Sequence, residues 1–205
     1  MGRSWLVCCL FGTIMLGCGS GSPPKGKRGG PEVVEKKGRI DGGEEEERHE
    51  KYDDSGGAVR LESLTLTAPK GWPRKAPRST FIQAEYVLPR ADGDSQDGRL
   101  TLSVAGGSIE DNIARWKDQF GGAPEKAREE KIDVKGVGVM TVDLSGVYND
   151  QAGPFAPAVK RPGYRMIAAI VPLGDQLHFV KAVGPARTME AQADKINAFI
   201  RSVTK

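Results

Sequence analysis

Alternating hydrophobic and polar positions predict a series of short β-strands in the second half of the chain. Apolar residues occupy every second position at 82–88 and again at 100–104, the spacing of a strand that buries one face. The Asp/Gly-rich stretch 92–98 between them is typical of a hairpin loop. A first strand is expected over 61–66, and further strands at 132–134, from 137 to about 148, at 164–171 and at 177–183, with a Pro/Gly-rich loop at 149–163.

Two segments have helical spacing. In the first, apolar residues recur on one face at Ile109, Ile113, Trp116 and Phe120. Ser108 followed by Asp111 indicates a capping box at its start, and Gly121-Gly122 ends it. In the second, the apolar face consists of Met189, Ala193, Ile196, Phe199, Ile200 and Val203. Strands and helices do not alternate regularly, so we expect an α+β domain with an antiparallel sheet flanked by helices.

The N-terminus has the pattern of a secretory leader. Arg3 precedes an apolar run from Trp5 to Leu16, which is shorter than the roughly 20 residues that a membrane span needs. The run ends in Met15-Leu16-Gly17-Cys18, which is similar to the lipobox of bacterial lipoproteins. We therefore expect residues 1–17 to be a signal peptide and Cys18 to carry lipid, including palmitate. An ordinary secretory peptide, or a leader that stays uncleaved, is the alternative.

A polar segment follows the lipobox. Residues 18–57 are nearly free of apolar side chains, basic in their first half and acidic in their second, which predicts a disordered tether before a domain at 58–205. The basic half would contact anionic lipid headgroups, or the charge blocks would only keep a spacer solvated. By resemblance to bacterial lipoproteins, Gly19 after the cysteine favours the outer membrane, with the domain facing the periplasm.

Composition argues against several kinds of chemistry. Cleavage after Gly17 would leave Cys18 as the sole cysteine, and His49 and His178 have no Cys or His neighbour, so we expect no metal and no cofactor. The formal net charge of +3 gives no indication of nucleic-acid binding. The sequence brings no histidine near Asp143 and Ser145, although folding could bring His178 close. Paired carboxylates of a hydrolase have no local pattern but stay open.

The domain resembles a known group of proteins through a set of short motifs. These are Gly71-Trp72, the Gly-Gly before the first helix, Asn112, Arg115-Trp116, Gln119-Phe120, the run from Asp143 to Tyr148, and Gly184-Pro185. Together they resemble uncharacterised bacterial predicted lipoproteins with a PsbP/Mog-like domain, an α/β/α sandwich. The resemblance implies a fold found mostly in accessory binding proteins, among them extrinsic photosystem II proteins and a Ran-binding nuclear protein. It transfers no functional residue.

Three regions could form a partner surface. The loop 69–80 combines basic residues with Trp72 and contains no acid; its basic residues are Lys70, Arg74, Lys75 and Arg78. The first helix places Asn112, Arg115 and Gln119 beside its apolar face. The loop 149–163 contains Phe155. Each region also has a structural interpretation: Trp72 tucked into the core, helix-edge residues that fix a loop, and a disordered segment.

The sequence therefore favours a lipid-anchored envelope protein whose domain is a non-enzymatic binding or accessory module. Its partners would be the membrane, through Cys18, and an envelope protein. The alternatives are a binder of polyanions or small ligands through the 69–80 loop, and an unrecognised carboxylate hydrolase.

Overall fold

The computed structural model describes residues 53–151 and 157–205, and the predicted signal peptide, Cys18, most of the tether and Phe155 lie outside these ranges. The chain divides into two units, Met1–Glu47 and Arg48–Lys205, and all described residues belong to the second. The carbonyl groups of Asp53 and Asp54 accept hydrogen bonds from the amides of Arg74 and Gly71. Contacts with the domain thus begin before residue 58.

A seven-stranded sheet forms the centre of the domain. Its strands are β3 (Arg74–Lys75), β4 (Ile82–Leu88), β5 (Gly98–Ala105), β6 (Lys126–Val134), β7 (Val137–Asp150), β8 (Val159–Leu173) and β9 (Gln176–Pro185). They lie in the order β3-β4-β5-β9-β8-β7-β6, and all neighbours are antiparallel. The α+β fold with an antiparallel sheet is therefore confirmed. β5 and β9 are adjacent although a helix and three strands separate them in sequence.

The expected first strand is in fact a separate hairpin. β1 (Gly57–Leu61) and β2 (Leu64–Ala68) pair antiparallel and place Leu61 opposite Leu64. The chain reverses at Glu62, which has a φ of +55° although it is not glycine. No Gly or Asn marks this turn in the sequence, so the leucines at 61, 64 and 66 have the pattern of one continuous strand. The end of the chain joins the hairpin through reciprocal backbone hydrogen bonds between Thr65 and Thr204.

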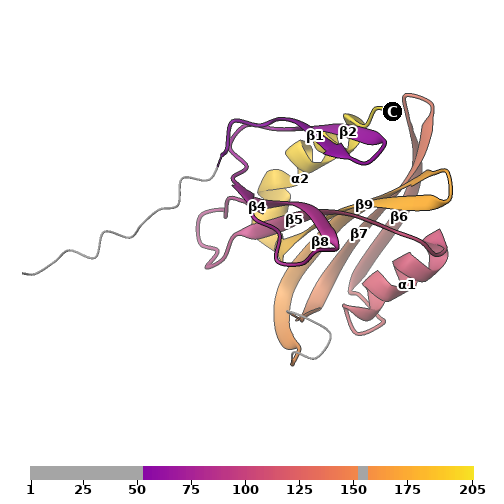
Figure 1. Ribbon diagram of the computed structural model, residues 1–205. Coiled ribbons are helices and arrows are strands. Elements are labelled where there is room, and N and C mark those ends of the chain that lie inside the picture. The colour runs from indigo at the N-terminus through magenta and orange to yellow at the C-terminus, as the bar shows by residue number, and fades with distance from the viewer. Residues whose placement is uncertain (1–52, 152–156) are drawn as a thin grey trace, which may run out of the picture. The chain divides into compact units, whose positions relative to one another are not determined.

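The two helices cover opposite faces of the sheet (Figure 1). α2 (Ala186–Arg201) lies between the β1–β2 hairpin and one face, and α1 (Ile109–Asp118) packs against the other. Each side has its own apolar core, because alternate residues of the central strands point to opposite faces. On the α2 side the core includes Met189, Ile196, Phe199 and Ile200, and on the α1 side Ile113, Trp116 and Phe120. Both predicted helical faces are confirmed.

Helix capping fixes both helices at their N-termini. Ser108 accepts a hydrogen bond from the Asp111 amide at 3.0 Å, as the capping pattern predicts. α2 follows Pro185, which offers no side-chain cap, and has no acid in its first turn. The carboxylate of Asp94, in the β4–β5 loop, accepts instead from the amide and the hydroxyl of Thr188, at 2.8 and 2.6 Å. A distant loop thus supplies the cap.

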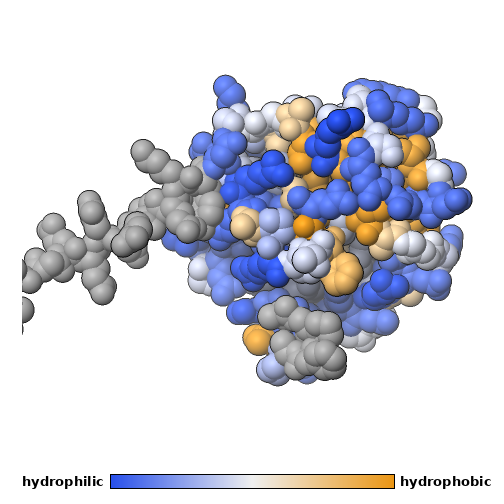
Figure 2. Space-filling model, in the orientation of Figure 1, coloured by the Kyte–Doolittle hydropathy of each residue, from blue (hydrophilic) through white to orange (hydrophobic). Residues whose placement is uncertain are grey.

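The predicted loop 149–163 is shorter than expected. β7 continues to Asp150 and β8 begins at Val159, so both flanks of that segment pair with each other. Pro162 and Gly163 suggested a loop, but they lie where the register between β7 and β8 shifts and the two residues need not pair. The face of the domain shown in Figure 2 is mostly hydrophilic, with apolar residues between the hydrophilic ones. None of the helices in the described ranges is long and apolar enough to cross a bilayer.

Candidate functional site

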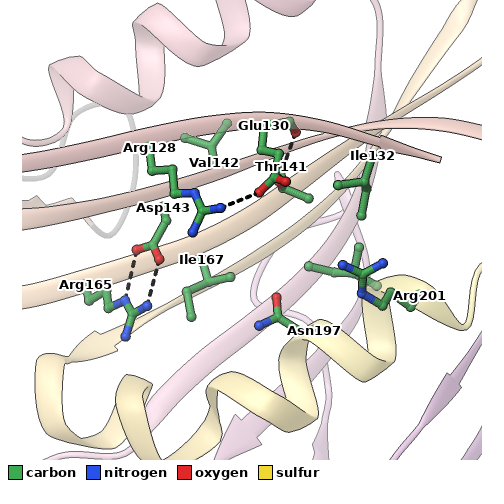
Figure 3. A pocket seen from close by; sticks show the side chains of 11 residues that line it. Arg128, Glu130, Ile132, Thr141, Val142, Asp143, Arg165, Ile167, Asn197 and Arg201 are labelled. Atoms are coloured by element: carbon green, nitrogen blue, oxygen red, sulfur yellow. Dashed lines mark hydrogen bonds and ion pairs between the residues drawn. The ribbon is translucent and has the colours of Figure 1, made fainter. Parts of the chain in front are cut away.

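A cavity lies beside α2, over β6, β7 and β8, and we call it the α2 groove (Figure 3). Its volume is about 420 Å³. Because α2 covers only part of its sheet face, the polar residues of the outer strands remain open to the groove. Its charged and polar lining residues are Arg128, Glu130, Thr141, Asp143, Arg165, Asn197 and Arg201.

Most charges in the α2 groove neutralise each other. Arg165 donates two hydrogen bonds to the Asp143 carboxylate, at 2.9 and 2.7 Å, and also contacts Glu190. Hydrogen bonding to Asp143 is the main factor that raises the pKa of Arg165. Arg128 donates to Glu130 at 2.8 Å. The carboxylates of the groove are thus already engaged by arginines of the same domain.

The opposite sheet face carries a different charge pattern. α1 covers β7, β8 and part of β9, and leaves polar residues of β4, β5 and β9 uncovered. Strand pairing places Lys75 opposite Glu85, Glu85 opposite Thr101, and Thr101 opposite Lys181 on this face. We define the basic face as the five cationic side chains gathered here around Glu85: Lys75, Arg78, Arg99, Arg115 and Lys181.

Glu85 is the buried acid at the centre of the basic face. It is 2% exposed and accepts two hydrogen bonds from Arg99, at 2.8 and 3.0 Å. Arg78 lies 3.7 Å from the same carboxylate. Burial raises the pKa of Glu85, but the hydrogen bonds and charge of Arg99, helped by Arg78, outweigh it and hold that pKa below its usual value. Glu85 is therefore ionised at neutral pH and offsets one of the surrounding cations.

Lys181 is the innermost cation of the basic face. Its Nζ donates to the side-chain oxygen of Gln119 at 2.6 Å and lies 5.8 Å from the centre of the Tyr148 ring. Burial, and secondly the charge of Arg99, lower the pKa of Lys181 to about 8, although Asp150 acts in the opposite direction. Burial also raises the pKa of Tyr148 to about 12, so its phenol stays neutral. No described carboxylate forms an ion pair with Lys181.

A small pocket of about 250 Å³ lies next to Lys181, between α1 and β5. Trp116 and Phe179 form part of its wall, with ring centres 5.9 Å apart and an edge-to-face arrangement. Phe81, 82% exposed, and Arg115 also line it. The pocket therefore combines an apolar wall with two cations, an arrangement that suits an anion with an apolar part.

The residues of the 69–80 loop that were predicted to form a partner surface do not lie together. Some lie on opposite faces of the sheet, and one lies in the core. Trp72 is buried, with 1% exposure; its ring packs against Phe199, and its indole N–H donates to Gln192 at 3.0 Å. Its prediction as a partner-surface residue is wrong, because its apolar ring fills the α2-side core. Lys75 and Arg78 belong to the basic face. Arg74 pairs with Tyr86, and so lies on the other face; Lys70 is exposed.

All three residues of the predicted helix stripe lie at the basic face or at the pocket beside it. Arg115 is exposed and lines the pocket, and Gln119 holds Lys181. Asn112 is largely buried and closes the first turn of α1, where its amide donates to the Ser108 carbonyl at 2.8 Å. It also lines the same pocket beside Arg115.

A serine triad is not assembled. Asp143 is bound to Arg165, whereas buried His178 contacts the Val171 carbonyl and lies 4.0 Å from Glu62. Across the described ranges, no three His, Cys, Asp or Glu side chains are grouped so that they could hold a metal ion.

Sequence reasoning missed Phe81, Glu85, Arg99 and Lys181. Lys181 had a detectable signal, because it is a lysine in a mostly apolar strand, 177–183, that lies inside the sheet. A lysine at such a position needs a local explanation. The grouping of β4, β5 and β9 had no signal, since it depends on pairing between segments far apart in sequence.

No family model matches the sequence, and neither does any curated protein. Solved structures of similar arrangement include the cyanobacterial PsbP of Synechocystis sp. PCC 6803, with 11% identity, 74% of this chain and 93% of that chain covered, and a TM-score of 0.46. Another is PA94 of Pseudomonas aeruginosa, a protein of unknown function and a possible regulator by its description (11%, 73% and 96%, TM-score 0.43). A third is LpqN of Mycobacterium tuberculosis, described as involved in cell envelope biogenesis (13%, 74% and 85%, TM-score 0.42). At this level the likeness is one of fold, and the functional argument rests on the residues of this chain.

Proposed function

We propose that the chain is a lipid-anchored protein of the bacterial cell envelope whose domain binds an anionic partner without catalysis. The anchor would be lipid on Cys18, in the outer membrane, with the domain in the periplasm. This part rests on the lipobox Met15-Leu16-Gly17-Cys18 and the apolar run before it, which lie outside the described residues.

The basic face carries the binding part of the proposal. The basic face gathers Arg78, Arg99, Arg115 and Lys181 with one buried carboxylate, whereas in the α2 groove arginines and carboxylates largely cancel. An excess of charge of one sign raises the local concentration of partners of the opposite sign and their association rate. The basic face is thus the surface on which the described domain attracts a partner most strongly, and that partner is anionic.

The carboxylates of the domain support binding over hydrolysis. Glu85 is the one buried acid among the described residues, and Arg99 holds it ionised. Asp143 and Glu190 share Arg165. Hydrolysis by two carboxylates needs one of them to keep a proton at working pH, which requires a raised pKa. The lowered pKa of Glu85 is the opposite of that requirement.

Heparin, a soluble polyanion, tests the binding surface directly. The full chain should bind heparin with an affinity that falls steeply with salt. The double variant Arg78→Gln/Arg115→Gln should bind more weakly and lower the slope of log affinity against log salt by about two. The matched control is Arg60→Gln/Lys195→Gln, which removes two exposed cations from the hairpin and α2. Equal losses in the two double variants would show that no particular face is used.

Labelling with radioactive palmitate in a bacterial host tests the anchor. The wild type should take up label and fractionate with the outer membrane, and Cys18→Ser should do neither. Acylation that persists in Cys18→Ser contradicts the lipobox interpretation.

A further inference from the structure

Lys181 is a half-buried cation without a counter-ion among the described residues. Its ammonium group has three N–H donors, and one of them is used by the amide oxygen of Gln119. A buried charge is normally paired, because the loss of hydration is otherwise uncompensated. Asp150 is the acid whose charge favours the charged form of Lys181, but its carboxylate already lies 3.4 Å from the guanidinium group of Arg161. The folded domain thus holds a positive charge for which it supplies no adequate partner.

The surroundings of Lys181 show where a partner would lie. Gln119 and Tyr148 occupy the side toward β7, and the pocket between α1 and β5 lies on the other side. Thr101 and Ser103 on β5 and Arg115 on α1 add polar groups to this pocket. A negatively charged group placed there would meet Lys181 and Arg115 together. Charge-assisted hydrogen bonds to such a group are stronger than those of Lys181 to a neutral amide.

The same pocket has an apolar side. Trp116 and Phe179 are buried members of the α1-side core, and their rings form its wall. Phe81 lines the pocket and is 82% exposed. Exposure of a large apolar side chain to water does not stabilise the fold. An apolar group seated in the pocket would cover one face of Phe81. At about 250 Å³, the pocket is below the size range of drug-like ligands, so its ligand is small.

We propose that this pocket binds a small amphiphilic carboxylate: the carboxylate pairs with Lys181 and Arg115, and a short aromatic or aliphatic body packs against Phe81, Trp116 and Phe179. The inference rests on the proposed function in one respect, that the basic face is a binding surface. It adds a specific site and a ligand class, whereas heparin would contact only the exposed cations.

Equilibrium dialysis of the detergent-solubilised full chain against radiolabelled phenylacetate tests this site, with protein-free detergent as the blank. Hexanoate in a parallel experiment separates an aliphatic from an aromatic preference, and either ligand supports the site. Phenylacetamide, which keeps the shape without the charge, should bind about 10- to 100-fold more weakly, the range expected for a lost charge-assisted hydrogen bond. Equal binding of acid and amide would overturn the proposal.

Two variants localise the binding. Lys181→Met, checked by circular dichroism, should lose about tenfold or more in affinity because it removes the charge and keeps the length of the side chain. Phe81→Ala should weaken binding severalfold without affecting the fold, since Phe81 is exposed; Val159→Ala, at an exposed apolar residue on β8, is its control. If Phe81→Ala binds as well as Val159→Ala, the body of the ligand does not lie in this pocket.

The pH dependence of phenylacetate binding gives an independent measurement. Lys181 is charged below its pKa of about 8 and neutral above it, so phenylacetate affinity should fall as pH rises through and beyond that value. The other ionisable groups that face Lys181 are Arg99, Asp150 and Tyr148, with Arg115 at the pocket. In Lys181→Met the pH dependence should vanish, and its persistence would assign the effect to another group. If the chain binds heparin but not phenylacetate, this site alone is overturned. If it binds phenylacetate but not heparin, the proposed function alone is overturned.

Discussion

Replacing Glu85 with glutamine should destabilise the domain far more than the same change in a surface ion pair. Glu85 is 2% exposed and accepts two hydrogen bonds from Arg99, whose side chain is 37% exposed. Glutamine keeps the shape and one acceptor oxygen but leaves Arg99 without its counter-charge. Breaking a fully buried pair costs about 3–5 kcal/mol. Partial hydration of Arg99 reduces this, and we expect a loss of about 2–3 kcal/mol.

Glu130→Gln is a control of the same chemistry. Glu130 pairs with Arg128 at 2.8 Å, the distance of the Arg99–Glu85 pair, but the two side chains are 50% and 76% exposed. The two pairs therefore differ mainly in burial. An exposed pair contributes about 0–1 kcal/mol. Urea unfolding of the full chains at pH 7, followed by circular dichroism, compares them. With a slope of about 2 kcal/mol per molar urea, Glu85→Gln should lower the midpoint by about 1 M or more, and Glu130→Gln by under 0.5 M.

The pH dependence of the Glu85 effect has a defined sign. The pKa of Glu85 is lowered by folding from its ordinary value of 4.5, so the folded state binds the proton less readily than the unfolded state. Its stabilising contribution is complete above 4.5 and is lost as the pH falls through the lower, folded pKa. The wild type and Glu85→Gln should therefore converge in stability in acid. A midpoint shift no larger than that of Glu130→Gln, or a difference independent of pH, would refute the burial argument.

Three further changes test the packing around the site. Trp72→Ala should cost about 3–5 kcal/mol in urea unfolding, because it empties a core position and leaves Gln192 without its indole donor; a loss under 1 kcal/mol would contradict its burial. Asp94→Ala should cost about 1–2 kcal/mol by removing the cap of α2, whereas Asp92→Ala in the same loop should cost under about 0.5 kcal/mol. His178→Leu should raise the thermal midpoint, since the buried Nε2 has no hydrogen-bond partner among the described residues; a marked fall would indicate that this nitrogen is satisfied.

The strands and helices that bury one face were predictable, because burial leaves a period in the sequence. The α2 helix and the strand at 100–104 follow that period closely. Two element boundaries were not predictable, because the turn and the bulge at these positions contain residues that are unusual there. Glu62 turns the hairpin in a conformation that normally selects Gly or Asn, and Pro162 lies within a strand that proline usually interrupts.

The candidate site was predictable only in fragments. Residues of the 69–80 loop and of the first helix were named separately, and Lys75, Arg78 and Arg115 do share one face. Local sequence contains no information on which strands separate them. Strand pairing inserts β5 and β9 between the loop and the helix, and these strands contribute Arg99 and Lys181. The position of Trp72 was not predictable, because an amphipathic residue on a loop can point inward as well as outward.

Charge, more than cavity size, distinguishes the two sides of the sheet. The α2 groove is the larger cavity, but an anion entering it must compete with Asp143 and Glu190 for Arg165. If the anion displaces one of these carboxylates from Arg165, the ion pair with that carboxylate is lost. This loss offsets part of the free energy gained from the new ion pair. Folding has already removed much of the hydration of Lys181, and no described carboxylate pairs with it. An anion in the pocket therefore breaks no existing ion pair when it binds Lys181. The smaller pocket should therefore bind a single carboxylate more tightly than the larger groove, and phenylacetate affinity should be unchanged by Arg201→Gln in the groove.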